Sequence, residues 1–136
     1  MRKRGKIDET VERYSVVRSL AAVDRSEVCV IMIDGSEGLT EQDTKIAGYV
    51  HDQGKAAVFA VNKWDLVEPE LRDEKLLKLK HQFSNSFHQI IKPMILAVSA
   101  ETGTGVQNMF RRIYEQWDYL CTTSLISGII VPLIYF

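Results

Sequence analysis

Three short runs of apolar residues stand out along the chain, at positions 28–33, 56–61 and 94–98. Each run contains β-branched side chains and is bounded by polar residues, glycine or proline. This length and composition predict strands rather than helices. The first two runs are apolar throughout, which predicts strands that are buried on both faces of a sheet.

Apolar residues at helical spacing predict four helices around these strands. We expect helices over 8–23, 41–53 and 70–83, and over a fourth segment that contains Val106, Met109, Phe110, Ile113 and Trp117. Thr40 is a suitable N-cap for the second helix because Asp43 follows three positions later. Gly54 suits the position that follows a helix end.

Helices and strands therefore alternate along the whole chain, beginning and ending with a helix. Alternation of this kind predicts an α/β fold of three layers, α/β/α, with a parallel sheet of about three strands. We expect residues 1–118 to form the domain and residues 119–136 to form an apolar extension of unclear role. The carboxyl ends of parallel strands share one edge of the sheet, and ligands bind at that edge.

Composition narrows the classes of function. The 136 residues are enough for one domain with a core, and the net charge of −1 favours neither DNA nor a membrane as a partner. Cys29 lies in an apolar run and is expected to be buried, and Cys121 is the second of two cysteines. Neither suggests a disulfide framework, and the basic N-terminus is no signal peptide, so we expect a cytoplasmic protein.

The last segment, Leu120–Phe136, does not fit the α/β pattern. It is largely apolar and uncharged, and Gly128 and Pro132 interrupt it. Its length is near the lower limit for a membrane span, but we favour a buried or disordered extension over a membrane anchor. Sequence that is foreign to this fold is a third alternative, and the three stay open at this point.

Polar residues follow two neighbouring strands where a ligand would bind. The second strand leads into Asn62-Lys63-Trp64-Asp65, and the third leads into Ser99-Ala100. Asparagine and aspartate are also common turn residues after strands, so the first motif alone would be a moderate signal. Both motifs together, separated by one β-α-β unit, resemble the guanine-recognition pair of the GTPase superfamily.

The chemistry of these residues fits guanine. A carboxylate at Asp65 can accept from the ring N–H and the amino group of the base, which lie side by side. The backbone N–H of Ala100 would meet the guanine carbonyl, whereas adenine presents an amino group there. Asn62 would tie the base to the neighbouring loop, and the methylene stem of Lys63 would cover one face of it. Ser99 would brace its own turn and Asp65.

A closer resemblance adds the family. Arg2–Ile7, Val11–Ser15, Thr40–Asp43 and Asn62–Val67 are similar to the second GTPase domain of the Der family, also called EngA. The similarity covers about residues 2–118 and implies the C-terminal portion of a P-loop-NTPase-type domain. It also implies GTP or GDP as ligand, Mg²⁺ as the cofactor of the family, and the large ribosomal subunit with its rRNA as partner.

The departures from the family matter as much. The 136 residues contain no Gly-x-x-x-x-Gly-Lys-Ser/Thr phosphate loop, and the γ-phosphate-sensing motif of the family would lie upstream of Met1. We therefore assign no catalytic residue and no Mg²⁺ ligand in this chain. Base contacts alone predict weak binding and no hydrolysis of GTP by the chain on its own. The three strands are also expected to expose an edge, which is an aggregation hazard.

Two other functions stay open. The chain could bind ribosomal RNA through its basic N-terminus, Arg2–Lys6, without binding a nucleotide, or it could be an incomplete product without independent function. Asp34 and Glu37, after the first strand, are interpreted as turn residues rather than as an acid pair. His51, His81 and His88 fall on different predicted segments without the spacing of metal ligands.

Overall fold

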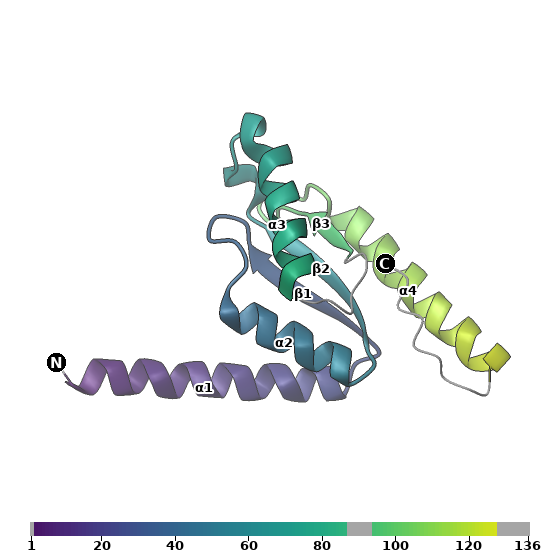
Figure 1. Ribbon diagram of the computed structural model, residues 1–136, viewed down its shortest axis with the longest axis horizontal. Helices are drawn as coiled ribbons and strands as arrows, with labels where there is room; N and C mark the ends of the chain where they lie inside the picture. Colours follow the sequence, from purple (N-terminus) through teal and green to yellow (C-terminus); the bar gives the residue numbers. More distant parts are fainter. Residues whose placement is uncertain (1, 87–93, 128–136) are drawn as a thin grey trace.

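The computed structural model describes residues 2–86 and 94–127, and Figure 1 shows how their elements are arranged. In chain order they are α1 (Arg2–Asp24), β1 (Val28–Asp34), α2 (Glu41–Asp52), β2 (Ala56–Asn62), the 3₁₀ turns η1 (Trp64–Leu66) and η2 (Pro69–Leu71), α3 (Arg72–Ser86), β3 (Ile95–Ala97) and α4 (Val106–Ser127). The predicted alternation of helices and strands is confirmed.

The strands form one parallel sheet in the order β1-β2-β3. β1 and β2 pair in register from Val28 opposite Ala56 to Asp34 opposite Asn62. β3 is shorter, and its last residue, Ala97, pairs with Val61. The carboxyl ends of all three strands therefore meet at one edge of the sheet, as the sequence predicted.

One face of the sheet packs against α1, α2 and α3. The buried cluster comprises Val23 from α1, Ala47 and Val50 from α2, Phe83 from α3, and Cys29, Ile31, Ile33, Ala57 and Phe59 from the strands. The rings of Phe59 and Phe83 lie with centroids 4.4 Å apart and a tilt of 56°. Through this tilted aromatic contact, α3 packs against the middle of β2.

Helix α4 lies against the opposite face of the sheet, which gives the three layers (Figure 1). Val58 and Ala60 on β2 are fully buried, so this central strand is covered on both faces as predicted. The same prediction is wrong for β1, because Val30 and Met32 are 36% and 49% exposed. The face of β1 toward α1 and α2 is buried, whereas α4 covers the opposite face only in part, so burial alternates along the strand.

The helices at the two ends are longer than the apolar pattern predicted. α1 begins at Arg2 rather than at Asp8, and α4 continues past residue 118 to Ser127. Neither extension contains proline, and helical hydrogen bonding can therefore continue through it. The remainder of the predicted apolar extension, 128–136, lies outside the described residues. In the described ranges, no helix has the length and apolar content needed to cross a bilayer.

The start of α2 shows how the sequence sets the loop after β1. Thr40 accepts a hydrogen bond from the backbone N–H of Asp43, and Asp43 accepts one from the backbone N–H of Thr40. This reciprocal capping box was predicted from the spacing and satisfies two otherwise unpaired donors. Gly54, with φ of 65°, follows the other end of the helix. The loop of residues 35–40 is thereby fixed beside the carboxyl edge of the sheet.

Candidate functional site

The loop after β2 has an unusual backbone at its first residue. Lys63 adopts a left-handed conformation, with φ of 60° and ψ of 31°, and among the described residues no other non-glycine residue has a positive φ. This bend redirects the chain from β2 into η1, which contains Asp65. The backbone N–H of Trp64 donates to the carbonyl of Val98 at 3.1 Å. The loop after β2 is thus tied to the end of β3.

The loop after β3 closes tightly around Ser99, which is only 1% exposed. Its backbone N–H donates to the carbonyl of Thr104, and its hydroxyl accepts from the backbone N–H of Thr102 at 3.2 Å. At Gly105 an added Cβ would lie 2.3 Å from the carbonyl oxygen of Ala97. That contact and its φ of 76° explain why glycine occupies this position.

Two side-chain hydrogen bonds join these loops. The Ser99 hydroxyl donates to Oδ1 of Asp65 at 2.6 Å, and the Ala100 backbone N–H donates to Oδ1 of Asn62 at 3.0 Å. Four of the five predicted residues are therefore in direct contact across the strand ends, and Lys63 follows Asn62 in sequence. The predicted contact between Ser99 and Asp65 is present. The Ala100 N–H, by contrast, already has a protein acceptor.

Asp34 is the residue that the sequence interpretation underrated. Its Oδ2 lies 2.5 Å from the Lys63 ammonium, and its Oδ1 accepts from the backbone N–H and hydroxyl of Ser36. Asp34 does stabilise a turn, as predicted, but it also reaches the neighbouring strand. The sequence did carry one signal, because an acidic residue at the end of a predicted parallel strand lies at the edge of the sheet where ligands bind.

The ion pair changes the titration of both partners. Hydrogen bonding by Lys63, and then by Ser36, lowers the pKa of Asp34 well below its usual range. Hydrogen bonding to Asp34 raises the pKa of Lys63 above its usual value. Both groups are therefore charged at neutral pH.

Gly35 brings the loop after β1 into direct contact with the same strand end. Its backbone N–H donates to the carbonyl of Asn62 at 2.8 Å. A Cβ at this position would lie 2.6 Å from that carbonyl oxygen and 3.6 Å from the Trp64 ring. A side chain at position 35 would therefore push apart the loops that follow β1 and β2.

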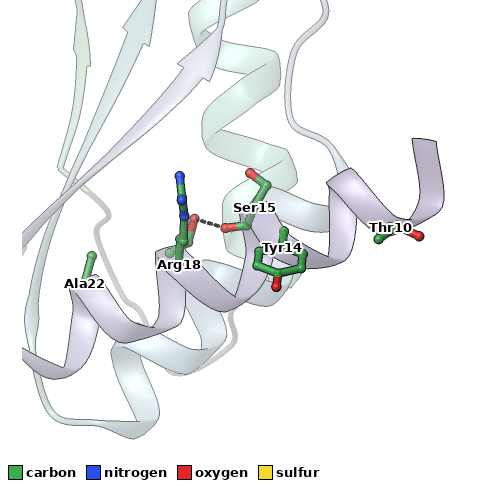
Figure 2. A pocket seen from close by; sticks show the side chains of 6 residues that line it. Thr10, Tyr14, Ser15, Arg18 and Ala22 are labelled. Atoms are coloured by element: carbon green, nitrogen blue, oxygen red, sulfur yellow. Dashed lines mark hydrogen bonds between the residues drawn. The ribbon is translucent and has the colours of Figure 1, made fainter. Parts of the chain in front are cut away.

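The strand ends combine an acceptor carboxylate, main-chain and side-chain amides, and the methylene stem of a lysine. Such groups suit a planar polar ligand. Across 2–86 and 94–127, no group of three or more His, Cys, Asp or Glu residues is arranged to hold a metal ion. Figure 2 shows side chains that line a hollow along α1, among them Tyr14, Ser15 and Arg18. On this helix the Ser19 hydroxyl donates to the backbone carbonyl of Ser15. All residues that line this hollow belong to α1, and none of the strand-end residues is among them.

A parallel sheet between two layers of helices, with polar loops at its carboxyl edge, defines the class of α/β nucleotide-binding domains. The chain belongs to the family described as the elongation factor Tu GTP binding domain, whose model matches residues 13–118. GTPases of this family bind GTP and GDP.

Curated relatives define the relationship further. The chain is 43% identical over 130 residues to GTPase Der of Finegoldia magna, covering 96% of this chain and 29% of that protein. It is 44% identical over 115 residues to GTPase Der of Staphylococcus haemolyticus, covering 85% of this chain and 26% of that protein. The resemblance to Der is confirmed, and the chain spans less than a third of the length of these relatives.

Solved structures support the same fold. Translation elongation factor SelB from Methanococcus maripaludis, in complex with the GTP analogue GppNHp, matches with a TM-score of 0.65 at 20% identity. The match covers 74% of this chain and 22% of SelB. Era, in complex with MgGDPNP and a segment of 16S ribosomal RNA, matches with a TM-score of 0.60 at 20% identity, over 71% of this chain and 31% of Era.

Proposed function

We propose that the chain recognises the guanine base of GTP and GDP through Asn62, Lys63, Asp65, Ser99 and Ala100. The observation that supports this most is the pair of hydrogen bonds, Ser99 to Asp65 and Ala100 to Asn62, that brings the two loops together. To read one purine base, the Asp65 carboxylate and the Ala100 backbone N–H must lie close together. The two hydrogen bonds keep the loops that carry these groups side by side.

Asp65 supplies the selection for guanine. Its carboxylate is held at Oδ1 by the Ser99 hydroxyl, and the residue is exposed enough to receive a ligand. Guanine offers a ring N–H and an amino group that this carboxylate accepts as a charge-assisted pair. Adenine lacks that pair of donors, so an adenine base would give the carboxylate no hydrogen bond beyond the one from Ser99.

Asn62 and Ala100 supply donors for the guanine carbonyl. The Ala100 N–H donates to Asn62 Oδ1, so an incoming carbonyl oxygen shares or displaces this bond. The carboxamide of Asn62 also carries an NH₂ group with two donors. At the equivalent position adenine has an amino group, which would face these donors and be repelled.

Phosphate recognition is the part that this chain does not provide. Its 136 residues contain no phosphate-loop motif and no hydroxyl of such a loop to hold Mg²⁺. Phosphoryl transfer depends on positioning and on charge stabilisation around the phosphates and the metal. We therefore propose weak, base-directed binding and no GTP hydrolysis by this chain alone. In the longer proteins of the family, Mg²⁺ would accompany the phosphates.

Titration of the ¹⁵N-labelled chain with GDP and with ADP tests the proposal, because NMR detects weak binding. GDP is expected to shift the amide signals of the loops after β2 and β3 at lower concentration than ADP. Asp65→Asn is expected to weaken GDP binding by about tenfold or more, because charge-assisted hydrogen bonds are lost. It should favour xanthosine diphosphate, whose carbonyl accepts from the new amide.

Asp73→Asn, an exposed change in the first turn of α3, is the matched control and should leave both affinities unchanged. Equal binding of GDP and ADP would remove guanine recognition. An unchanged base preference in Asp65→Asn would remove Asp65 as the reader.

We also propose a role in ribosome biogenesis, at the large subunit, because the resemblance to the Der family implies this partner. The match to Era, which was solved with ribosomal RNA, supports RNA as a partner of the same fold. We propose that the protein acts in the cytoplasm, where the free thiols of Cys29 and Cys121 stay reduced. Cosedimentation with large ribosomal subunits at increasing salt tests the association, and absence of cosedimentation at low salt would contradict it.

A further inference from the structure

Asp34 connects the first strand of the sheet to the proposed guanine site. It is the last residue of β1 and lies opposite Asn62 in the strand register. Both of its carboxylate oxygens have partners: Oδ1 accepts from Ser36, and Oδ2 contacts the ammonium of Lys63. One oxygen thus fixes the turn after β1, and the other fixes a side chain on the neighbouring loop.

Lys63 has reason to need such an anchor. Its side chain is 52% exposed, and a lysine stem has four rotatable bonds that are free in solution. Its left-handed backbone aims the stem along the strand ends, but the backbone does not set the position of the ammonium. The Asp34 carboxylate, itself only 27% exposed and held by Ser36, provides a fixed point.

We propose that Asp34 is a positioning residue for guanine nucleotides, which holds Lys63 so that its methylene stem is preorganised to cover one face of the base. The inference rests on the proposed function, and it adds β1 to a site otherwise built from the loops after β2 and β3. Preorganisation lowers the entropy that is lost when a flexible side chain is ordered by a ligand.

The arrangement of contacts supports this role. Asp34 links β1 to Lys63, directly after β2, and Asn62, the last residue of β2, accepts from the backbone N–H of Ala100 after β3. The three strand ends are therefore joined in sequence by side-chain bonds. The charges of Asp34 and Lys63 stabilise each other, since the pKa of Asp34 is lowered and that of Lys63 is raised by their contact.

The test compares GDP binding and Lys63 mobility in the full chain. Asp34→Asn keeps an oxygen for Ser36 but loses the charge that holds Lys63. We expect it to weaken GDP binding about twofold to fivefold, the range for an exposed ion pair. NMR relaxation of the Lys63 side chain is expected to show greater motion, while the amide signals of β1 and β2 stay in place.

Lys63→Met separates the stem from the charge, because methionine keeps an apolar chain of similar length. In this background Asp34→Asn should cause no further loss of GDP affinity, as a thermodynamic cycle requires for a residue that acts through Lys63. Glu115→Gln, which breaks the ion pair with Arg112 on α4, is the matched control and should not change GDP binding.

Unchanged or tighter GDP binding in Asp34→Asn would overturn the inference, and tighter binding would mean that Asp34 holds Lys63 away from the base. An equal loss in the Lys63→Met background would also overturn it, because Asp34 would then act on the fold. If the unaltered chain itself shows no preference for GDP over ADP, the proposed function fails and takes this inference with it. The two failures are therefore distinguishable.

Discussion

The hydroxyl of Ser99 donates a 2.6 Å hydrogen bond to Oδ1 of Asp65, across the ends of two neighbouring parallel strands. Ser99 is 1% exposed and also accepts from the backbone N–H of Thr102, so its hydroxyl serves both loops. A residue 34 positions away thereby fixes the carboxylate that we propose reads the base. This relationship suggests how a single buried hydroxyl affects both stability and ligand preference.

Ser99→Ala removes that hydroxyl and leaves the Thr102 N–H without its acceptor. We expect a loss of about 1–3 kcal/mol in the free energy of unfolding, because a buried donor loses its partner. Urea denaturation measures this loss. GDP binding should weaken as well, since Asp65 gains rotational freedom. Ser84→Ala on α3, whose hydroxyl bonds only its own helix, is the control and should change neither quantity appreciably. Equal effects in the two variants would contradict the role of Ser99.

The Asp34–Lys63 pair predicts a distinctive dependence on pH. A carboxylate with a lowered pKa contributes stability that is fully present above its ordinary pKa of 3.8 and is lost as pH falls through the lower folded value. For Lys63, whose pKa is raised, the contribution is full below its ordinary value of 10.5 and is lost only at higher pH. The pair therefore stabilises the fold across the whole range between these two ordinary values.

Carboxyl ¹³C NMR of the chain between pH 7 and about 3 measures the Asp34 titration directly. We expect little change in the Asp34 signal over this range, because its pKa is lowered. Lys63→Met should bring the midpoint back toward the ordinary value. Lys45→Met, which removes the partner of Glu41 instead, should not affect Asp34. If the titration midpoint of Asp34 is the same in Lys63→Met as in the unaltered chain, the ion pair is absent in solution.

The Phe59–Phe83 contact predicts where the fold is most sensitive to truncation. Phe83 is fully buried and meets Phe59 across the interface of α3 with the sheet. Phe83→Ala is expected to cost about 3–5 kcal/mol in the free energy of unfolding. Leu77→Ala on the same helix, at a side chain that is 57% exposed, should change it by about 0.5 kcal/mol or less. Similar losses in both would mean that α3 does not pack on the sheet.

The outer edge of β1 predicts self-association. In the described part of the chain β1 pairs only with β2, and Val30 and Met32 on it are exposed. An apolar strand edge of this kind can pair with another chain, and a lysine on it opposes such pairing. Met32→Lys is therefore expected to reduce aggregation in dynamic light scattering. Leu77→Lys adds the same charge on α3 and should reduce it less. Equal improvement would indicate a general effect of charge.

Much of the architecture could be predicted from local patterns. Short β-branched runs predicted the three strands, and Thr40 with Asp43 predicted the start of α2 to the residue. These features depend on a few neighbouring residues, which is why a linear pattern reveals them. Helix ends were less accurate, because α1 begins at Arg2 rather than at Asp8 and no proline or cap in between marks its start.

Burial and contacts between strand ends were decided by the tertiary structure. The composition of β1 resembles that of β2, but β2 is buried on both faces whereas α4 covers β1 only in part, so Val30 and Met32 are exposed. Nor does any local pattern relate Asp34 to Lys63, because their contact depends on the register of β1 with β2. The sequence by itself determined which polar residues follow which strands. Only the packed sheet decided which of them touch, since hydrogen bonds over a few ångströms require strands that are distant in sequence to lie side by side.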